Sequence, residues 1–524
     1  PRWRKPSDLL IPTPAKPHVT VAGLRELVAA IAQDDRVGGV LFRFGALGCG
    51  WAVAESLRAL FGELRRAGRR TVAWLPDGAT SREYFVAAAA DKVIASPQAT
   101  VAPLGVAASL TFVRGLLARG GIEAEVFARR EYKSAAEAFT RDSYSEANRR
   151  QTEALLDRLH TAFVSAIAEG RRVDEARARK LVDEGPYRAP DALREGLLDA
   201  LAYEDDLVTH LGSGDVKLVA GGDYLALARS LRFRPLLPAR RVGVVEIRGP
   251  IVSEARIAFG QIADARRITG ALRMARMNPS LGAVVLHIDT GGGSALASDN
   301  IAREVERLRD KKPVVAYFAD IAASGGYYSA ALANEIVAQP TTVTGSIGVI
   351  ALRFAARGML DKLGLSHEVI RRGERAALMS PYRAWAEGDR AAFDREIDGF
   401  YNDFVSIVAR GRKRDTAEIE PLARGRVYAG ADAHAVGLVD HLGGLDAALE
   451  RARTLAGGRF AREPVVVPPP WVMPDPPEPP RSVQALMAFV GDAARSRAGL
   501  NLLQLALSSP NEHLFAYEDA VDVE

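Results

Sequence analysis

A single internal duplication, at the length of a whole domain, limits most strongly what this chain can fold into. Three segments of the first half return in the second half at offsets of 244, 243 and 241 residues. A nearly constant offset over about 160 residues indicates two homologous domains and excludes short solenoid repeats. The matching pairs are Gly38–Gly45 with Gly282–Asp289, Ala87–Pro97 with Ala330–Pro340, and Gly196–Asp199 with Gly437–Asp440.

Each copy alternates apolar strand patterns with amphipathic helix patterns, which predicts an α/β fold with parallel strands. Two long helices, Ser145–Ala168 and Ala386–Val408, follow the two sheets and are suited to packing the copies, or neighbouring chains, together. The other elements expected in the first copy are helices at Val21–Ala32, Trp51–Ala67 and Ser81–Ala90, and strands at Gly39–Phe44, Thr71–Leu75 and Val93–Ala95.

Composition divides the chain into three parts. We expect an N-terminal repeat at 1–238, a C-terminal repeat at 239–462, and a tail at 463–524. The tail begins with nine prolines in the seventeen residues Pro464–Pro480, a composition typical of a stiff linker. Val483–Leu507 then has the pattern of one or two amphipathic helices, which either pack on the protein or bind a membrane surface or partner.

Charge and cysteine content exclude some classes of partner and cofactor. The 524 residues have a net charge of only +4, and no basic run with interleaved aromatic residues suggests nucleic-acid binding. The single cysteine, Cys49, excludes a disulfide framework and a cysteine zinc site. No apolar run reaches the ~18–20 residues of a membrane span. The chain begins at Pro1 rather than Met, which is compatible with removal of an N-terminal signal or anchor.

Ser324 stands where an apolar strand, Val314–Phe318, passes into a helix. Gly325 and Gly326 follow it, so the backbone can turn sharply and nothing bulky shields the hydroxyl. A helix N-terminus also offers free N–H groups to a developing negative charge. The pattern therefore fits a serine nucleophile, and the alternative is an ordinary serine helix cap.

A glycine-rich loop, Thr290–Ser294 (TGGGS), follows the strand Val284–Asp289 and precedes a helix. The nucleotide-binding patterns G-x-x-x-x-G-K-[ST] and G-x-G-x-x-G are absent, which leaves an oxyanion hole as the better interpretation of the loop. Adjacent parallel strands place their ends on one rim, so this loop and Ser324 should lie together.

A serine nucleophile needs a base. Among the eight histidines, His287 lies in an apolar strand and is better suited to the core or to a sheet face than to a base, and the rest fall outside the candidate loops. The local sequence AASGG also lacks the G-x-S-x-G pattern, which disfavours a Ser-His-Asp hydrolase. Lys133, in EYKSAAEAF, has apolar neighbours that could desolvate it and lower its pKa. The alternative for Lys133 is a solvated lysine at the start of a helix.

Together, the motifs TGGGS, DIAASGGYYSA, TGSIGV and EYKSAAEAF resemble those of signal peptide peptidase A, in its long, double-repeat bacterial form. The resemblance covers roughly residues 20–460. It implies tandem duplicated Clp-protease/crotonase-like domains with parallel sheets and flanking helices, and a Ser/Lys dyad without metal or cofactor. By motif, the dyad is Ser324 and Lys133. The resemblance further implies oxyanion-hole amides at Gly292, Gly293 and Gly325, and a lysine-orienting hydroxyl at Ser346.

Two positions depart from the family pattern, although neither removes a reacting atom. Gly291 stands where the family usually has proline, and Ala138 replaces the proline of the lysine motif. The duplication also predicts one site for the two copies. An offset of 243 takes Lys133 to Ala376, and it takes Ser324 back to Ser81, which Arg82 and Glu83 follow in place of two glycines.

The resemblance implies a serine endopeptidase that cleaves short peptides, remnant signal peptides above all, as a homotetramer on the periplasmic side of a bacterial inner membrane. Two alternatives remain from the residues. A crotonase-like acyl-CoA enzyme would use the same oxyanion loop and tolerate loss of Lys133. A non-catalytic scaffold would keep the fold and act through its tail.

Overall fold

The computed structural model describes residues 20–211, 217–231, 239–255, 261–383, 385–461, 464–468, 514–515 and 522–523. The chain forms two compact units, which do not follow the two repeats. The first unit contains residues up to 48, 53–104 and 165–234, and the second contains 49–52, 105–164 and everything from 235 onward. The segment 105–164 of the first repeat, which includes Lys133, thus belongs to the same unit as Ser324.

The first unit is built on a parallel sheet with the strand order β1-β2-β3-β8. The helices and strands expected here are found within a few residues of their predicted bounds. The main elements are α1 (Val21–Ala32), β1 (Gly39–Arg43), α2 (Trp51–Arg66), β2 (Arg70–Leu75), α3 (Ser81–Ala87), β3 (Lys92–Ala95), β4 (Thr100–Val101), α7 (Glu175–Asp183), β7 (Tyr187–Arg188), α8 (Ala189–Arg194), β8 (Ala200–Leu201), α9 (Leu207–Leu211) and α10 (Gly221–Ser230).

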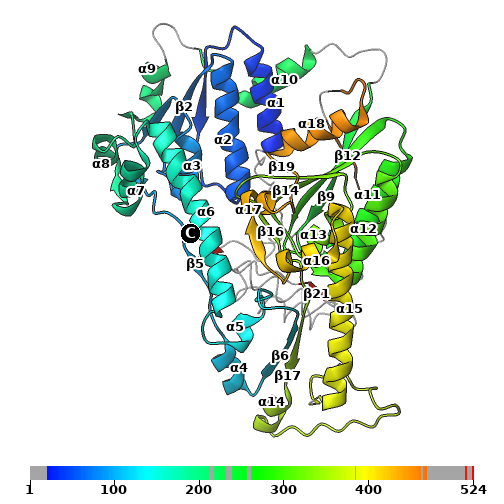
Figure 1. Cartoon of the computed structure of the whole chain (residues 1–524). Coiled ribbons are helices and arrows are strands. Elements are labelled where there is room, and N and C mark those ends of the chain that lie inside the picture. Colours follow the sequence, from blue (N-terminus) through cyan, green and yellow to red (C-terminus); the bar gives the residue numbers. More distant parts are fainter. Residues whose placement is uncertain are drawn as a thin grey trace, which may run out of the picture. The chain divides into compact units, whose positions relative to one another are not determined.

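The second unit has a larger sheet with the order β18-β16-β14-β12-β9-β20, in which β9, β12 and β14 are parallel (Figure 1). The strands of the second unit, which also include a smaller sheet of β11, β10, β13 and β21 (Leu514–Phe515), are β9 (Arg241–Arg248), β10 (Ile251–Val252), β11 (Ala263–Asp264), β12 (Leu281–Thr290), β13 (Gly293–Ser294), β14 (Val314–Ala323), β15 (Glu335–Ala338), β16 (Val343–Gly345), β18 (Val427–Ala429), β19 (His441–Leu442) and β20 (Val465–Val466). Its helices include α6 (Glu146–Arg171, mostly in this unit), α11 (Ala265–Met277), α12 (Ala295–Arg309), α13 (Gly325–Ala330), α15 (Glu387–Arg412), α16 (Thr416–Ile419), α17 (Gly430–Ala435) and α18 (Leu445–Ala456).

Both faces of this sheet are buried, which explains why β12 and β14 are continuous apolar runs rather than alternating ones. Leu286 and Phe318 belong to the core formed with α11, α12 and α13. Val285 and Tyr317, one residue away on the same strands, belong to the core formed with α18. The period-two alternation of side chains thus gives each strand a part in both cores.

An antiparallel ribbon joins segments more than 200 residues apart in the sequence. Strand β6 (Glu123–Ala128) pairs with β17 (Ile350–Ala355) along its whole length, and the two lie side by side in Figure 1. Short helices follow or precede them: α4 (Arg114–Gly120), α5 (Glu137–Thr140) and α14 (Arg357–Lys362). Because β6 leads to Lys133 and β17 follows Ser346, the ribbon brings these two residues to one place.

The start of the tail differs from the sequence-based expectation. The sequence places residues 464–468 in the proline-rich linker, but β20 within them pairs with β9. Val467 is 7% exposed and belongs to the core under α11 and α12. Three consecutive valines between prolines are a strand signal that the proline count obscured. The expected helices at Val483–Leu507 lie outside the described residues.

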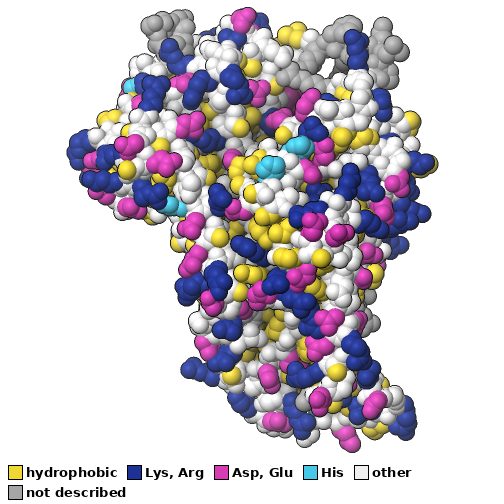
Figure 2. All heavy atoms as spheres, in the orientation of Figure 1, with side chains coloured by type: hydrophobic (Ala, Val, Ile, Leu, Met, Phe, Trp, Pro, Cys, Tyr) yellow, Lys and Arg dark blue, Asp and Glu magenta, His cyan; other side chains and the backbone are white. Residues whose placement is uncertain are grey.

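The helices that the structure describes include none with the length and hydropathy needed to cross a membrane. Figure 2 shows basic and acidic side chains interspersed over the visible surface. Many of them form ion pairs at the surface, where such pairs contribute only about 0–1 kcal/mol each.

Candidate active site

Ser324 occupies the turn between β14 and α13, as the sequence predicts. Its backbone has φ 54° and ψ −117°, in a region that L-residues rarely adopt. The hydroxyl does not cap the helix, because no helix N–H donates to it. Its side chain is buried, and the Lys133 amine lies against its hydroxyl. The backbone N–H donates to the Gly345 carbonyl at 2.9 Å.

Lys133 reaches Ser324 from the loop that follows β6. Its Nζ lies 2.9 Å from Ser324 Oγ. The side chain is only 5% exposed, so the alternative of a solvated lysine is wrong. Burial lowers the pKa of the Lys133 ammonium to about 7, from an ordinary value of 10.5. A substantial fraction of the amine is therefore neutral near pH 7, as a general base requires.

Ser346 supplies the other polar neighbours of the amine. Lys133 Nζ lies 2.9 Å from Ser346 Oγ and 3.0 Å from the Ser346 carbonyl oxygen. A neutral amine has two N–H donors and one lone pair. The two donors match the two oxygens of Ser346, which leaves the lone pair to accept the proton of Ser324 Oγ. The three contacts thus orient a neutral lysine toward the serine.

Two glycines allow close packing around the buried lysine. A Cβ on Gly425 would lie 2.6–2.8 Å from the backbone N, Cα and Cβ of Lys133, and φ at Gly425 is 78°. A Cβ on Gly348 would lie 3.3 Å from Lys133 Cδ. A side chain at 425 would displace Lys133, and one at 348 would first meet the backbone of Gly425, at 2.8 Å. The sequence analysis did not single out these two glycines, although Gly348 belongs to the TGSIG motif that it used.

Gln151 of α6 ties the lysine loop to the large sheet. Its side-chain amide donates to Ser134 Oγ at 2.9 Å, and its carbonyl oxygen accepts the Val427 N–H at 3.2 Å. This residue escaped the sequence analysis because one glutamine within an amphipathic helix gives no distinguishing signal. Through these two contacts, α6 holds the loop that carries Lys133 against strand β18.

The glycine loop approaches Ser324, but its amides are not equivalent. The Gly292 N–H donates to Thr290 Oγ1 at 3.0 Å, so the expected role of Gly292 in an oxyanion hole does not fit this geometry. The Gly293 nitrogen lies 3.2 Å from where a Cβ on Gly325 would stand. Gly293 and Gly325 therefore remain the best-placed pair of amides, and both glycines permit close approach of the backbone.

Strand β13, which begins at Gly293, has neighbours on both edges. On one edge it pairs in parallel with β10, where the Ile251 N–H donates to the Gly292 carbonyl at 2.8 Å. On the other edge it pairs antiparallel with β21 (Leu514–Phe515), so that Gly293 faces Phe515 in register. This second edge can thus accept an extended chain by β-strand addition.

The equivalent place in the first repeat holds an acidic side chain. Glu83 stands where the second glycine after the serine would be, and its carboxylate accepts the Leu47 N–H at 2.7 Å and the Thr80 N–H at 3.1 Å. Glu83 is 6% exposed. Backbone amides that could hold an oxyanion beside Ser81 are therefore already occupied by a carboxylate of the chain itself.

His287 lies on β12, where its ring packs against Tyr317 with 5.4 Å between centroids. Burial lowers the pKa of His287. His287 is half-buried, and its placement agrees with the expectation of a core or sheet-face residue rather than a base.

The family model described as peptidase family S49 matches the chain twice, at residues 63–218 and 306–459. The two matches confirm the duplication inferred from the constant offset. Among solved structures, ClpP1 from Listeria monocytogenes is similar at 15% identity and a TM-score of 0.25, covering 38% of this chain and 91% of that one.

Two curated relatives match most of the chain. "Serine protease SPPA, chloroplastic" from Arabidopsis thaliana is 30% identical over 83% of this chain, and the match spans 65% of that protein. "Protease 4" from Salmonella typhi is also 30% identical over 83% of this chain, and the match spans 72% of that protein. The family model covers more than half of the sequence, in the arrangement of two α/β repeats that the fold has. The chain therefore belongs to peptidase family S49 and is a serine peptidase.

Proposed function

We propose that Ser324 is the nucleophile and Lys133 the general base of a peptide-bond hydrolase. The observation that carries this proposal is the 2.9 Å separation of Lys133 Nζ and Ser324 Oγ in a buried site. Ser346 acts as a positioning residue, since its two oxygens hold the amine with its lone pair toward the hydroxyl.

Each proton in the proposed reaction passes through Lys133. Ser324 Oγ forms a bond to the substrate carbonyl carbon while its proton passes to Nζ. The amides of Gly293 and Gly325 stabilise the oxyanion. The C–N bond then breaks as Nζ gives that proton to the leaving amine. Water attacks the acyl-enzyme, loses a proton to Nζ, and the ester bond breaks as Ser324 Oγ regains a proton.

A serine-reactive fluorophosphonate probe tests the assignment directly. The probe should label Ser324, as located by mass spectrometry of tryptic peptides, and labelling should be lost in Lys133→Ala. An acyl-CoA enzyme with this fold would tolerate loss of Lys133, and a non-catalytic scaffold would give no labelling of Ser324. Equal labelling of wild type and Lys133→Ala would therefore remove the lysine from the proposed mechanism.

The proposed substrates are short peptides bound as extended strands, with remnant signal peptides as the source that the family resemblance suggests. A substrate would take the place of β21 on this edge of β13, where backbone hydrogen bonds do not depend on the side chains of the peptide. The same resemblance leads us to propose a homotetramer on the periplasmic side of a bacterial inner membrane. Sedimentation of the purified protein and fractionation of cells that express it test these two points separately.

The pH dependence of kcat/KM should report the ionisation of Lys133. The reaction needs the neutral amine, so activity should rise with pH and level off above an apparent pKa near 7. The same shift affects stability. Between about 7 and 10.5 the unfolded chain binds more protons than the folded one, so the free energy of unfolding should rise with pH. A pH profile that stays flat between roughly 5.5 and 8.5 would contradict a lysine base with this pKa.

Removing everything after Pro468 should leave cleavage of a short soluble peptide near the wild-type rate or above it. This cut retains β20 and the buried Val467, and it removes β21 from the edge of β13. A matched cut after Glu463 also removes β20 and Val467. Loss of the buried Val467 side chain alone should lower the free energy of unfolding by about 1.5–3 kcal/mol. Peptide kinetics and thermal melts of the two truncations check this. A folded but inert protein ending at Pro468 would make the tail part of the site.

A further inference from the structure

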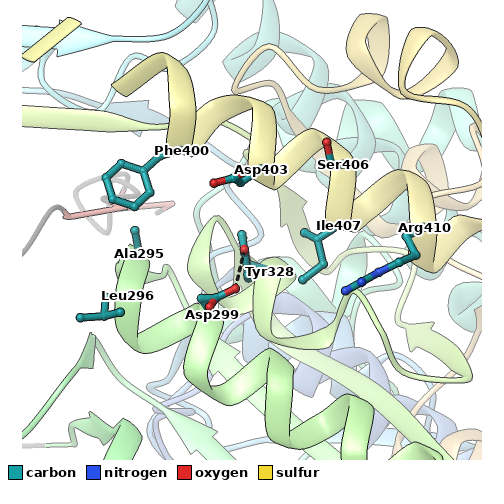
Figure 3. A pocket seen from close by; sticks show the side chains of 9 residues that line it. All are labelled: Ala295, Leu296, Asp299, Tyr328, Phe400, Asp403, Ser406, Ile407 and Arg410. Carbon is teal, nitrogen blue, oxygen red and sulfur yellow. Dashed lines mark hydrogen bonds between the residues drawn. The ribbon is translucent and has the colours of Figure 1, made fainter. Parts of the chain in front are cut away.

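A pocket of about 390 Å³ within the second unit is lined by residues of the two helices that start at the candidate active site. Figure 3 shows that it opens between helix α15 and the first turns of α12 and α13. These last two helices begin at the glycine loop and at Ser324, respectively. The Tyr328 N–H in fact donates to the Ser324 carbonyl at 2.9 Å. The pocket therefore borders the first turn of the helix that begins at Ser324.

The walls of the pocket are apolar on one side and acidic on the other. Leu296, Phe400 and Ile407 provide apolar surface. Asp299 and Asp403 provide two carboxylates from facing helices, and both are exposed to solvent within the pocket. Within the part of the chain that the structure describes, no ion pair is found for either carboxylate.

The remaining charged groups leave this acidity largely uncompensated. Arg410 lines the far end of the pocket, but its guanidinium lies 3.5 Å from Glu306 of α12. The Tyr328 hydroxyl donates to Asp299 Oδ1 at 2.8 Å, which fixes that carboxylate in place without neutralising it. Burial, together with the charges of Asp299 and Asp403, raises the pKa of Tyr328 well above its usual range, so this hydroxyl remains a donor.

The edge of β13 leads into this pocket. Ala295, the first residue after β13, lines it. A peptide that pairs antiparallel with β13, as β21 does, runs past Gly293 and then, toward its own amino end, past Ser294 and Ala295. Residues on the amino-terminal side of the cleaved bond are therefore the ones that reach the pocket.

We infer that this pocket is a specificity site for a basic side chain, lysine or arginine, on the amino-terminal side of the cleaved bond. The inference rests on the proposed peptidase function. The long methylene stem of such a side chain would lie along Leu296, Phe400 and Ile407, and its charge would lie between Asp299 and Asp403. A glutamate at the same place would face both carboxylates and be disfavoured.

A lysine scan through the four residues before the cleaved bond of a peptide substrate tests the inference. At one position, lysine should give a kcat/KM about fivefold higher than acetyl-lysine, which has the same stem without the charge. The preference should weaken at about 0.5 M salt, since the carboxylates are exposed. Equal rates for lysine and acetyl-lysine at all four positions would overturn the inference.

Substitutions of Asp299 and Asp403 test whether these carboxylates cause the preference for lysine. Asp403→Asn and Asp299→Asn should each reduce it, Asp403→Glu should retain it, and Asp403→Lys should shift it toward glutamate. Asp310→Asn removes an exposed carboxylate at the other end of α12 and should leave the preference unchanged. If the preference survives Asp299→Asn and Asp403→Asn together, the pocket does not recognise the side chain.

The outcomes also separate this inference from the proposed function. Wild-type cleavage without lysine selectivity would defeat the inference alone. Cleavage that persists undiminished in Ser324→Ala would defeat the proposed nucleophile, and the pocket assignment with it. If Asp403→Asn changes the oligomeric state measured by sedimentation but leaves the selectivity unchanged, the pocket is a contact between copies of the chain, and the inference is wrong.

Discussion

Purified Ser324→Ala should lose cleavage of a peptide substrate by about three orders of magnitude or more, because removal of a nucleophile leaves no route to the acyl-enzyme. The change deletes one oxygen at a fully buried position. The hydroxyl makes no cap bond to helix α13, so the variant should fold and melt close to wild type. Steady-state kinetics and a thermal melt on the same preparation check both statements. Activity within a factor of ten of wild type would rule out Ser324 as the nucleophile.

Ser81→Ala is the matched control for that substitution. Ser81 stands at the equivalent position of the first repeat, after a strand and at the start of α3. The nearby amides of Leu47 and Thr80 are bound to the Glu83 carboxylate, and the repeat offset places an alanine, Ala376, where a second lysine would be. Ser81→Ala should therefore retain wild-type kinetics. A large loss in this variant would indicate a second working site.

The pairing of Ser324 with Lys133 could be inferred from the sequence because it rests on one local pattern and one motif resemblance. The strand-to-helix turn with two glycines is determined by neighbouring residues, and β14 and α13 form there as predicted. The motif resemblance then supplied a base 191 residues away, which no periodicity argument could have found. The antiparallel ribbon of β6 and β17 is the physical link between them.

Other features depend on tertiary contacts that a sequence pattern does not contain. Any of three consecutive glycines could donate to an oxyanion, and they are distinguished only by tertiary geometry: the Gly292 N–H donates to Thr290 Oγ1, and the Gly293 nitrogen lies near Gly325. The requirement for glycine at 425 arises from contact with Lys133, almost 300 residues earlier in the chain. The position of 105–164 within the second unit likewise follows from packing, not from the repeat boundary.

Lys133→Ala should match the loss seen in Ser324→Ala, because Ser324 cannot lose its proton efficiently without a base. The double variant should be no slower than either single variant. Two residues that act on the same proton fail together, so their effects on the activation free energy do not add. Additive losses in the double variant would mean that each residue contributes by a separate route.

Lys133→Met separates catalysis from packing. Alanine would leave a cavity beside Gly348 and Gly425, whereas methionine keeps most of the volume. Burial disfavours the ammonium, so the folded state is penalised wherever Lys133 is protonated, and that penalty is greatest below pH 7. The free energy of unfolding of Lys133→Met should therefore exceed that of wild type in acid, and the difference should shrink as the pH rises toward 10. Denaturant unfolding at several pH values measures this difference. A variant that is more stable than wild type yet inactive assigns the lysine to chemistry. A variant equally destabilised at every pH would mean that loss of structure explains the loss of activity.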